Sequence, residues 1–227
     1  MRRNLYIALG DSITAGYGAN HPHATFVYQV SRFAREKGIA DRTMIVAQNG
    51  WTSKDIWRAV NLMGDLIWKQ TNVVTLMAGG NDLRRLLRRL YLPVSGPIIT
   101  PGLIEHVRAQ FAHHMNLLCH FIQLRNVPYV TVATVYNPVP HVPIAADAFQ
   151  KLNTTIRHLA NHYGFTVSDV FTEFQNQESQ LIEGYRNGVF EDLISPFRRP
   201  IHPNRAGHAR IANTITKSLR SLVPPAG

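Results

Sequence analysis

The chain has 227 residues, of which 45% are hydrophobic and 17% are charged. This composition is typical of a globular protein and excludes a disordered chain. Its one cysteine, Cys119, excludes an intrachain disulfide, and no apolar run approaches the roughly 20 residues that a transmembrane helix needs. Arg2 and Arg3 lead directly into an apolar run, without a separate signal-peptide core. We therefore expect a single cytoplasmic domain over residues 1–227, and leave open whether a leader was removed.

Apolar runs alternate with helical periodicity along the chain. Short apolar or β-branched runs predict five strands, at residues 5–9, 43–47, 73–78, 129–135 and 165–170. Longer segments with apolar residues three and four apart predict five main helices, at residues 26–37, 52–63, 103–124, 146–163 and 203–222. Strand followed by helix, five times over, predicts an α/β fold with a five-stranded parallel sheet and helices on both faces.

The first strand ends in Gly10-Asp11-Ser12-Ile13-Thr14. A serine at a glycine turn after a buried strand is well placed to expose its hydroxyl at the edge of a sheet. In a parallel sheet the reactive crevice lies beyond the carboxyl ends of the strands. Asn49-Gly50 follows the second strand and Gly80-Asn81-Asp82 follows the third, so three polar segments are expected at one edge.

A serine hydroxyl needs a neighbouring base to act as a nucleophile. Our candidate base is His202, because Pro203 suits the first turn of the closing helix and would hold His202 at its start. His21 and His23, in the loop after Ser12, are the main rivals, whereas His208 is expected only to pack. Cys119 lies in an apolar helical pattern and is expected in the core.

Asn81 is the candidate electrophilic helper. Its carboxamide can donate a hydrogen bond to the oxygen that gains charge when Ser12 attacks a carbonyl, and the backbone N–H groups of Gly50 and Ser12 are further candidate donors. A structural alternative is that Asn81-Asp82 caps the helical pattern that follows it.

Together these blocks resemble the SGNH, or GDSL, hydrolase family. The resemblance rests on the Gly-Asp-Ser-Ile-Thr stretch, on Asn49-Gly50, on Gly79-Gly80-Asn81-Asp82 and on His202-Pro203-Asn204. Membership implies a flavodoxin-like, three-layer α/β/α fold and an esterase or lipase that works through an acyl-serine without cofactor or metal. By position, Ser12 matches the nucleophile, Gly50 and Asn81 the oxyanion-hole donors, and His202 the base.

The chain departs from the family pattern at one position. The family places an aspartate three residues before the histidine to orient it, and here that residue is Arg199, which offers no acceptor. Asp192, Glu191 or a backbone carbonyl could take the role, or the enzyme could work as a weaker dyad.

The net charge of +10 has two interpretations. A basic surface attracts anionic partners such as a phospholipid surface, or it serves only solubility. The helical pattern over residues 83–90 has leucines on one face and arginines on the other, which fits either role. We see no nucleic-acid-binding motif. The expected substrate is a small ester: a short acyl ester, a lysophospholipid or an acetylated sugar. The alternative is a catalytically weakened protein of this fold that binds an anionic partner.

Overall fold

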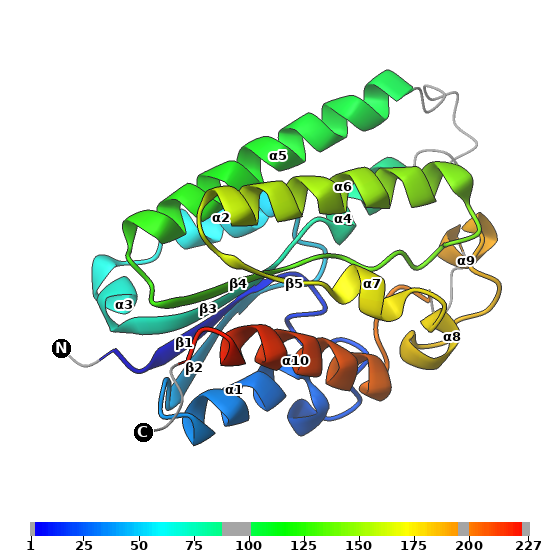
Figure 1. The fold of residues 1–227 in the computed structure, drawn as a ribbon. Helices are drawn as coiled ribbons and strands as arrows, with labels where there is room; N and C mark the ends of the chain where they lie inside the picture. Colours follow the sequence, from blue (N-terminus) through cyan, green and yellow to red (C-terminus); the bar gives the residue numbers. More distant parts are fainter. Residues whose placement is uncertain (1–2, 88–100, 195–199, 224–227) are drawn as a thin grey trace.

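The centre of the protein is a parallel sheet of five strands. A computed structural model of the chain describes residues 3–87, 101–194 and 200–223 (Figure 1). The strands are β1 (Leu5–Gly10), β2 (Arg42–Ala47), β3 (Thr71–Met77), β4 (Tyr129–Ala133) and β5 (Thr166–Ser168). Their order in the sheet is β2-β1-β3-β4-β5, and every neighbouring pair is parallel. The five strands and the parallel sheet predicted from the sequence are therefore confirmed.

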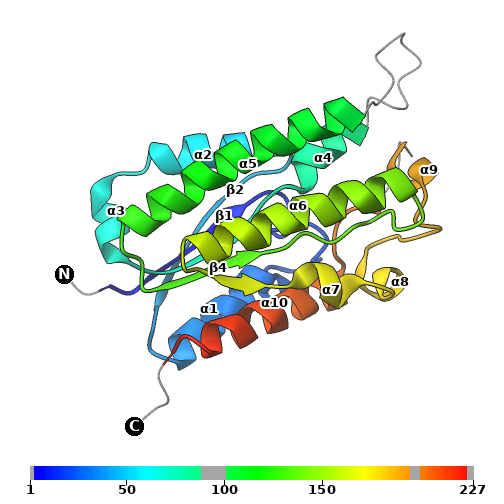
Figure 2. The same cartoon turned by 45° about the horizontal axis from the view of Figure 1, so that its top comes forward.

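Helices cover both faces of this sheet, as Figures 1 and 2 show. On one face lie α1 (Phe26–Glu36) and α10 (Arg205–Arg220), which pack against each other. On the other lie α2 (Ser53–Asn61), α5 (Pro101–Leu124) and α6 (Pro143–His162). The molecule is thus the three-layer α/β/α sandwich expected from the sequence.

The two layers of helices have separate cores because strand side chains alternate between the faces of the sheet. In β1, Leu5, Ile7 and Leu9 pack on the side of α2, α5 and α6, together with Cys119. Tyr6 and Ala8 point the other way and join the core under α1 and α10. All six residues of β1 are buried, which explains why residues 5–9 form one continuous apolar run in the sequence.

Shorter elements complete the described chain. They are a 3-10 turn (Pro22–Ala24), α3 (Asp65–Gln70), α4 (Gly80–Leu87), α7 (Val170–Phe174), α8 (Glu178–Leu181) and α9 (Phe190–Ile194). The sequence analysis did not predict α3, α7, α8 or α9, because helices this short have too few turns to show a period. Only the first part of the 83–90 helical pattern lies within the described residues.

The last helix starts later than we expected. Helix α10 begins at Arg205, and the Asn204 side chain caps it by accepting a hydrogen bond of 3.0 Å from the N–H of Gly207. Pro203 lies outside the helix and pairs in an isolated bridge with Ile182. His202 therefore lies in a bend that follows the turn at residues 200–201, next to the bridge between Pro203 and Ile182, and not in the first helical turn of α10.

The strand order reverses between the neighbouring strands β1 and β3. The chain continues from β1 to α1 on one face of the sheet, and from β3 to α4 on the other. Ligand crevices of open α/β sheets lie at such a switch point, beyond the carboxyl ends of the strands. Ser12 and Asn81 follow these two strands. Within the described residues no helix is both long enough and apolar enough to cross a bilayer.

Candidate active site

Ser12 lies in a tight turn that immediately follows β1. The Asp11 side chain accepts the N–H of Ile13 at 3.0 Å, and the carbonyls of Asp11 and Ser12 accept the N–H groups of Ala15 and Tyr17. A Cβ on Gly10 would lie 2.0 Å from Thr14 Oγ1, so only glycine fits at the bend. The turn fixes the Ser12 side chain on a rigid strand end.

His202 meets Ser12 across most of the chain. Its Nε2 lies 3.0 Å from Ser12 Oγ, although the two residues are 190 positions apart. The backbone on either side of the imidazole is fixed: the N–H of Glu183 donates to the His202 carbonyl at 2.9 Å, and the Tyr136 hydroxyl donates to the Ile201 carbonyl at 2.8 Å. This contact between hydroxyl and imidazole is the geometry that a serine nucleophile and its base require.

The imidazole of His202 is kept neutral by its surroundings. Its pKa is lowered from 6.5 to about 4, chiefly by burial and also by the positive charge of Arg84 and by the nearby His208. A neutral imidazole has one nitrogen free to accept a proton, so His202 can act as a base across the neutral pH range.

Asn81 lies in the first turn of α4 and faces the same pocket. Its Nδ2 donates to the Trp51 carbonyl at 2.9 Å and to Asp11 Oδ2 at 3.3 Å, while its Oδ1 accepts from Arg84 Nε at 3.0 Å. Because arginine only donates, Arg84 fixes which way the carboxamide is turned. Its N–H groups therefore point at the Trp51 carbonyl and at Asp11, which precedes Ser12 in the chain and lines the same pocket.

Gly50 lies farther from this cluster. Its φ is +81°, which favours glycine, and its carbonyl accepts a hydrogen bond of 2.8 Å from Arg85. It is not among the described residues that line the pocket, although its neighbour Trp51 is bonded to Asn81. Its role as a donor stays a prediction.

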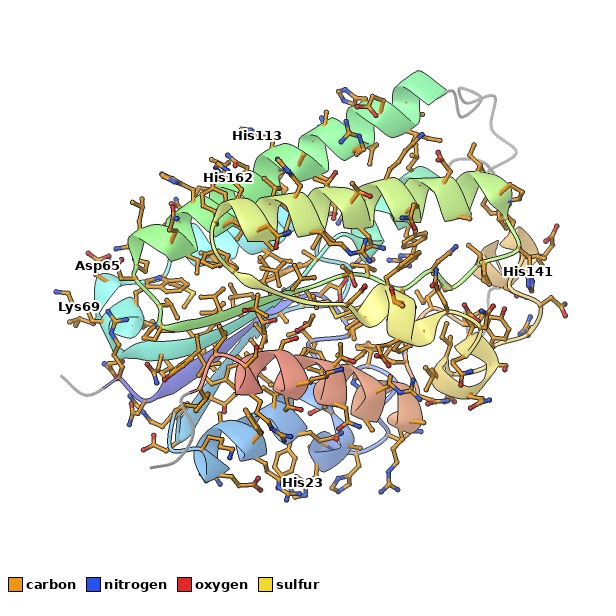
Figure 3. The ribbon with its side chains drawn as sticks, viewed as in Figure 1. His23, Asp65, Lys69, His113, His141 and His162 are labelled. Carbon is orange, nitrogen blue, oxygen red and sulfur yellow. The ribbon has the colours of Figure 1, made fainter. Side chains whose placement is uncertain are left out.

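The rival histidines lie elsewhere. His21 and His23 are both exposed, and His23 stacks on Tyr28 with ring centroids 4.4 Å apart. Figure 3 shows His23 at the outer side of the α1 layer, with His113 and His162 on the outer side of α5 and α6. Among the described histidines, only His202 lines the pocket at Ser12.

The pocket beside Ser12 is small and largely apolar, with a volume of about 40 Å³. Its polar lining consists of Asp11, Ser12, Asn81, Arg84 and His202, and its apolar lining includes Ile13, Val135, Tyr136, Pro138, Phe149 and Ile201. Tyr136 is fixed by its hydroxyl bond and by stacking on Phe174 at a centroid distance of 4.3 Å. The walls of the pocket are thus firmly packed.

None of the expected carboxylates orients His202 within the described part of the chain. Asp192 Oδ2 accepts the N–H groups of Asn187, Gly188 and Val189, so this side chain caps the turn that leads into α9. Glu191 is exposed. Arg199 lies outside the described residues. Across residues 3–87, 101–194 and 200–223, the His202 ring makes one hydrogen bond, the one to Ser12.

The sequence analysis missed one buried residue near the site. We expected His208 only to pack, yet it is fully buried and both ring nitrogens are used. Nδ1 accepts from the N–H of Phe26 at 3.3 Å, and Nε2 donates to the carbonyl of Tyr17 at 2.8 Å. His208 therefore ties α10 to the turn that carries Ser12. The sequence offered no signal for this role, because both partners of His208 lie near the other end of the chain.

A parallel α/β/α sandwich with a serine and histidine in contact at its switch point defines an SGNH-type hydrolase. The chain matches the GDSL-like Lipase/Acylhydrolase family over residues 8–210. It belongs to that family, and it is a carboxylic ester hydrolase.

Comparisons with individual proteins agree with this assignment. The spore germination lipase LipC of Bacillus licheniformis is 24% identical over 182 residues, which cover 78% of this chain and 84% of that protein. The lipase Lip_vut3 from a goat rumen metagenome has the same fold, with a TM-score of 0.75 and 20% identity over 95% of this chain and 97% of that one. Axe2, an acetylxylan esterase from Geobacillus stearothermophilus, gives a TM-score of 0.66 at 15% identity over the whole of both chains.

Proposed function

We propose that the protein hydrolyses small carboxylic esters through a covalent acyl-serine on Ser12. The observation that carries the proposal is the 3.0 Å contact between Ser12 Oγ and His202 Nε2. His202 takes the hydroxyl proton while Oγ attacks the ester carbonyl, and the carbonyl oxygen becomes an oxyanion. The protonated imidazole then gives its proton to the departing alcohol. Water, activated by His202, next attacks the acyl-serine and releases the acid and the free serine.

Asn81 is the proposed side-chain donor to the oxyanion, alongside the backbone N–H groups of Ser12 and Gly50. Its shorter bond, at 2.9 Å, goes to Trp51, and its longer one, at 3.3 Å, goes to Asp11. An oxyanion formed beside Ser12 can compete for the second N–H, since burial raises the pKa of Asp11 to about 6 and so weakens its hold as a carboxylate near that pH. Arg84 keeps the carboxamide turned for this donation.

The dimensions of the pocket favour a short acyl group. Phe149 and Val135 contribute to its apolar lining, and its volume of about 40 Å³ suits a few carbon atoms better than a long chain. Among the three substrate classes, short acyl esters and acetylated sugars fit this pocket, while a lysophospholipid would need its acyl chain to lie elsewhere. The acetylxylan esterase among the structural neighbours is compatible with this choice.

The test is hydrolysis of p-nitrophenyl acetate, butyrate and octanoate by the native protein and by Ser12→Ala. We expect the acetate and butyrate esters to be hydrolysed fastest, and Ser12→Ala to lose about 10⁴-fold or more in kcat. Reaction with a fluorophosphonate should add one phosphonyl group to the native protein and none to Ser12→Ala. Equal hydrolysis by both proteins would contradict the proposal and favour the binding-protein alternative.

A further inference from the structure

The ring of Tyr17 lies against the imidazole of His202. We propose that Tyr17 is a positioning residue, whose ring holds the imidazole of His202 against Ser12. This inference rests on the proposed role of His202 as the base. The ring centroids of Tyr17 and His202 lie 5.1 Å apart with their planes at 34°, within the range of favourable ring contacts.

Tyr17 is held where it can do this. Its N–H donates to the Ser12 carbonyl at 3.0 Å and its carbonyl accepts from the fully buried His208 at 2.8 Å. The flanking Gly16 and Gly18 have φ values of +97° and +84°, which side chains rarely allow. The backbone of Tyr17 is therefore fixed on both sides, so its ring has a defined place beside the imidazole.

The same turn approaches the histidine segment at van der Waals distance. A Cβ on Gly18 would lie 2.1 Å from the Pro203 carbonyl and 3.3 Å from the Cβ of His202. The turn that carries the nucleophile thus packs directly on the backbone of the base. Together with the bond from Glu183 to the His202 carbonyl, this contact fixes the backbone of His202 and leaves ring rotation as the motion to be restrained.

An aromatic wall restrains that rotation and also excludes water. In related triads an orienting acid both directs the imidazole and stabilises its charged form. A neutral ring can do only the first, so His202 should remain a weak base, in keeping with the burial that dominates its lowered pKa. Tyr17 is 50% exposed and its ring contacts the imidazole, so we expect its removal to admit water to His202.

The charged and titratable groups around the imidazole come from four elements. Arg84 faces it from α4 and His208 from α10, and both lower its pKa. Asp11 and Tyr136 line the same pocket from the ends of β1 and β4. All four are retained when Tyr17 alone is changed, so a shift between variants reports the ring and not these groups.

The test compares Tyr17→Ala and Tyr17→Phe on p-nitrophenyl acetate over pH 3.5–9, a range of about five units chosen to span both titrations of His202 and Asp11. Tyr17→Ala is expected to lower kcat by about 10- to 100-fold, since small misplacements of a catalytic group have such effects, and to leave KM nearly unchanged. In the pH profile of kcat/KM, the acid limb is the fall in activity as His202 takes up a proton. In Tyr17→Ala this limb should move up toward pH 6.5, the ordinary pKa of histidine. Tyr17→Phe keeps the ring, so both its kcat and the pH of its acid limb should match those of the native protein.

A matched control is Tyr28→Ala, which removes a half-buried tyrosine that stacks on His23 on the outer side of α1. It should leave kcat and the acid limb unchanged. Because acid lowers the stability of the protein, circular dichroism of Tyr17→Ala is recorded over the same pH range, and the limb is read only where this variant is as folded as the native protein.

Three results would overturn the inference: native behaviour of Tyr17→Ala, a loss of kcat without a shift of the limb, or an equal defect in Tyr17→Phe. Ser12→Ala separates this inference from the proposed function. If Ser12→Ala is inactive while Tyr17→Ala behaves as native, only the role of Tyr17 fails. If Ser12→Ala stays active, the proposed function fails first.

Discussion

The turn after β1 and the segment before α10 supply the two halves of the site, and they are fixed by different means. The turn is held by local hydrogen bonds: Asp11 to Ile13, Ser12 to Tyr17, and a glycine bend with no room for a side chain. The segment around His202 is held by distant partners, among them Glu183, Tyr136 and the turn itself. A nucleophile can thus be built locally, whereas its base depends on the assembled fold.

Two histidines near the C-terminus, the half-buried His202 and the fully buried His208, sharpen the contrast. His208 has a partner on each ring nitrogen, which fixes its tautomer with the proton on Nε2. His202 has its hydrogen bond on Nε2 alone within the described residues, so its proton can move. Burial lowers the pKa of both. The two histidines therefore differ at Nδ1, which accepts a hydrogen bond in His208 and makes none with the described residues in His202.

Apart from the loss of Ser12 itself, the largest effect is expected from Asn81, which lies in the first turn of α4 beside the turn that carries Ser12. Asn81→Ala should lower kcat by about 10²- to 10³-fold, the usual cost of one oxyanion-hole donor, with a smaller change in KM. The measurement is steady-state hydrolysis of p-nitrophenyl acetate. Asn116→Ala is the matched control, because that asparagine bonds Tyr163 on the surface of α5. A native rate in Asn81→Ala would show that the oxyanion is held by backbone N–H groups only.

The next effect is on stability and comes from His208. His208→Phe keeps a ring of similar shape but leaves the Phe26 N–H and the Tyr17 carbonyl without partners. The free energy of unfolding should fall by about 2–4 kcal/mol, measured by urea denaturation. His162→Phe, an exposed change at the end of α6, should cost little. If both variants unfold at the same urea concentration, His208 does not tie the two halves together.

The role of His208 in stability can also be tested by the pH dependence of unfolding. The pKa of His208 is lowered in the folded protein, so the unfolded chain binds more protons as the pH falls below 6.5. Its contribution to stability is therefore present at neutral pH and lost in acid. His208→Phe should show a shallower loss of stability on acidification than the native protein, and an identical slope would mean that this histidine takes up its proton while folded.

The smallest effect is expected from Arg84, which connects the halves. Arg84→Gln removes the charge that lowers the pKa of His202 and the donor that orients Asn81. The acid limb of kcat/KM, expected near pH 4 in the native protein, should move upward, and kcat should fall by about tenfold or less. Arg58→Gln, an exposed arginine of α2, is the charge-matched control. An unmoved limb would contradict an electrostatic link between Arg84 and His202.

The sequence by itself determined the architecture and the chemistry of the nucleophile. Continuous apolar runs such as β3 and alternation with helical periods need only local patterns, and they fixed a parallel α/β sheet. The Gly-Asp-Ser turn is likewise local, since its hydrogen bonds lie within a few residues. The closing helix was predicted to start too early, because the Asn204 side chain caps it and the bridge that holds Pro203 outside it is a long-range contact with Ile182.

Only the tertiary structure decided how His202 is oriented. Asp192 was a reasonable candidate in the sequence, but its carboxylate is already used by three backbone N–H groups of its own turn. His208 and Tyr17 could not be assigned from the chain, because their partners lie about 190 residues away in sequence or in a turn whose path depends on packing. Hydrogen bonds within a turn follow from neighbouring residues, whereas contacts between chain ends follow from the whole fold.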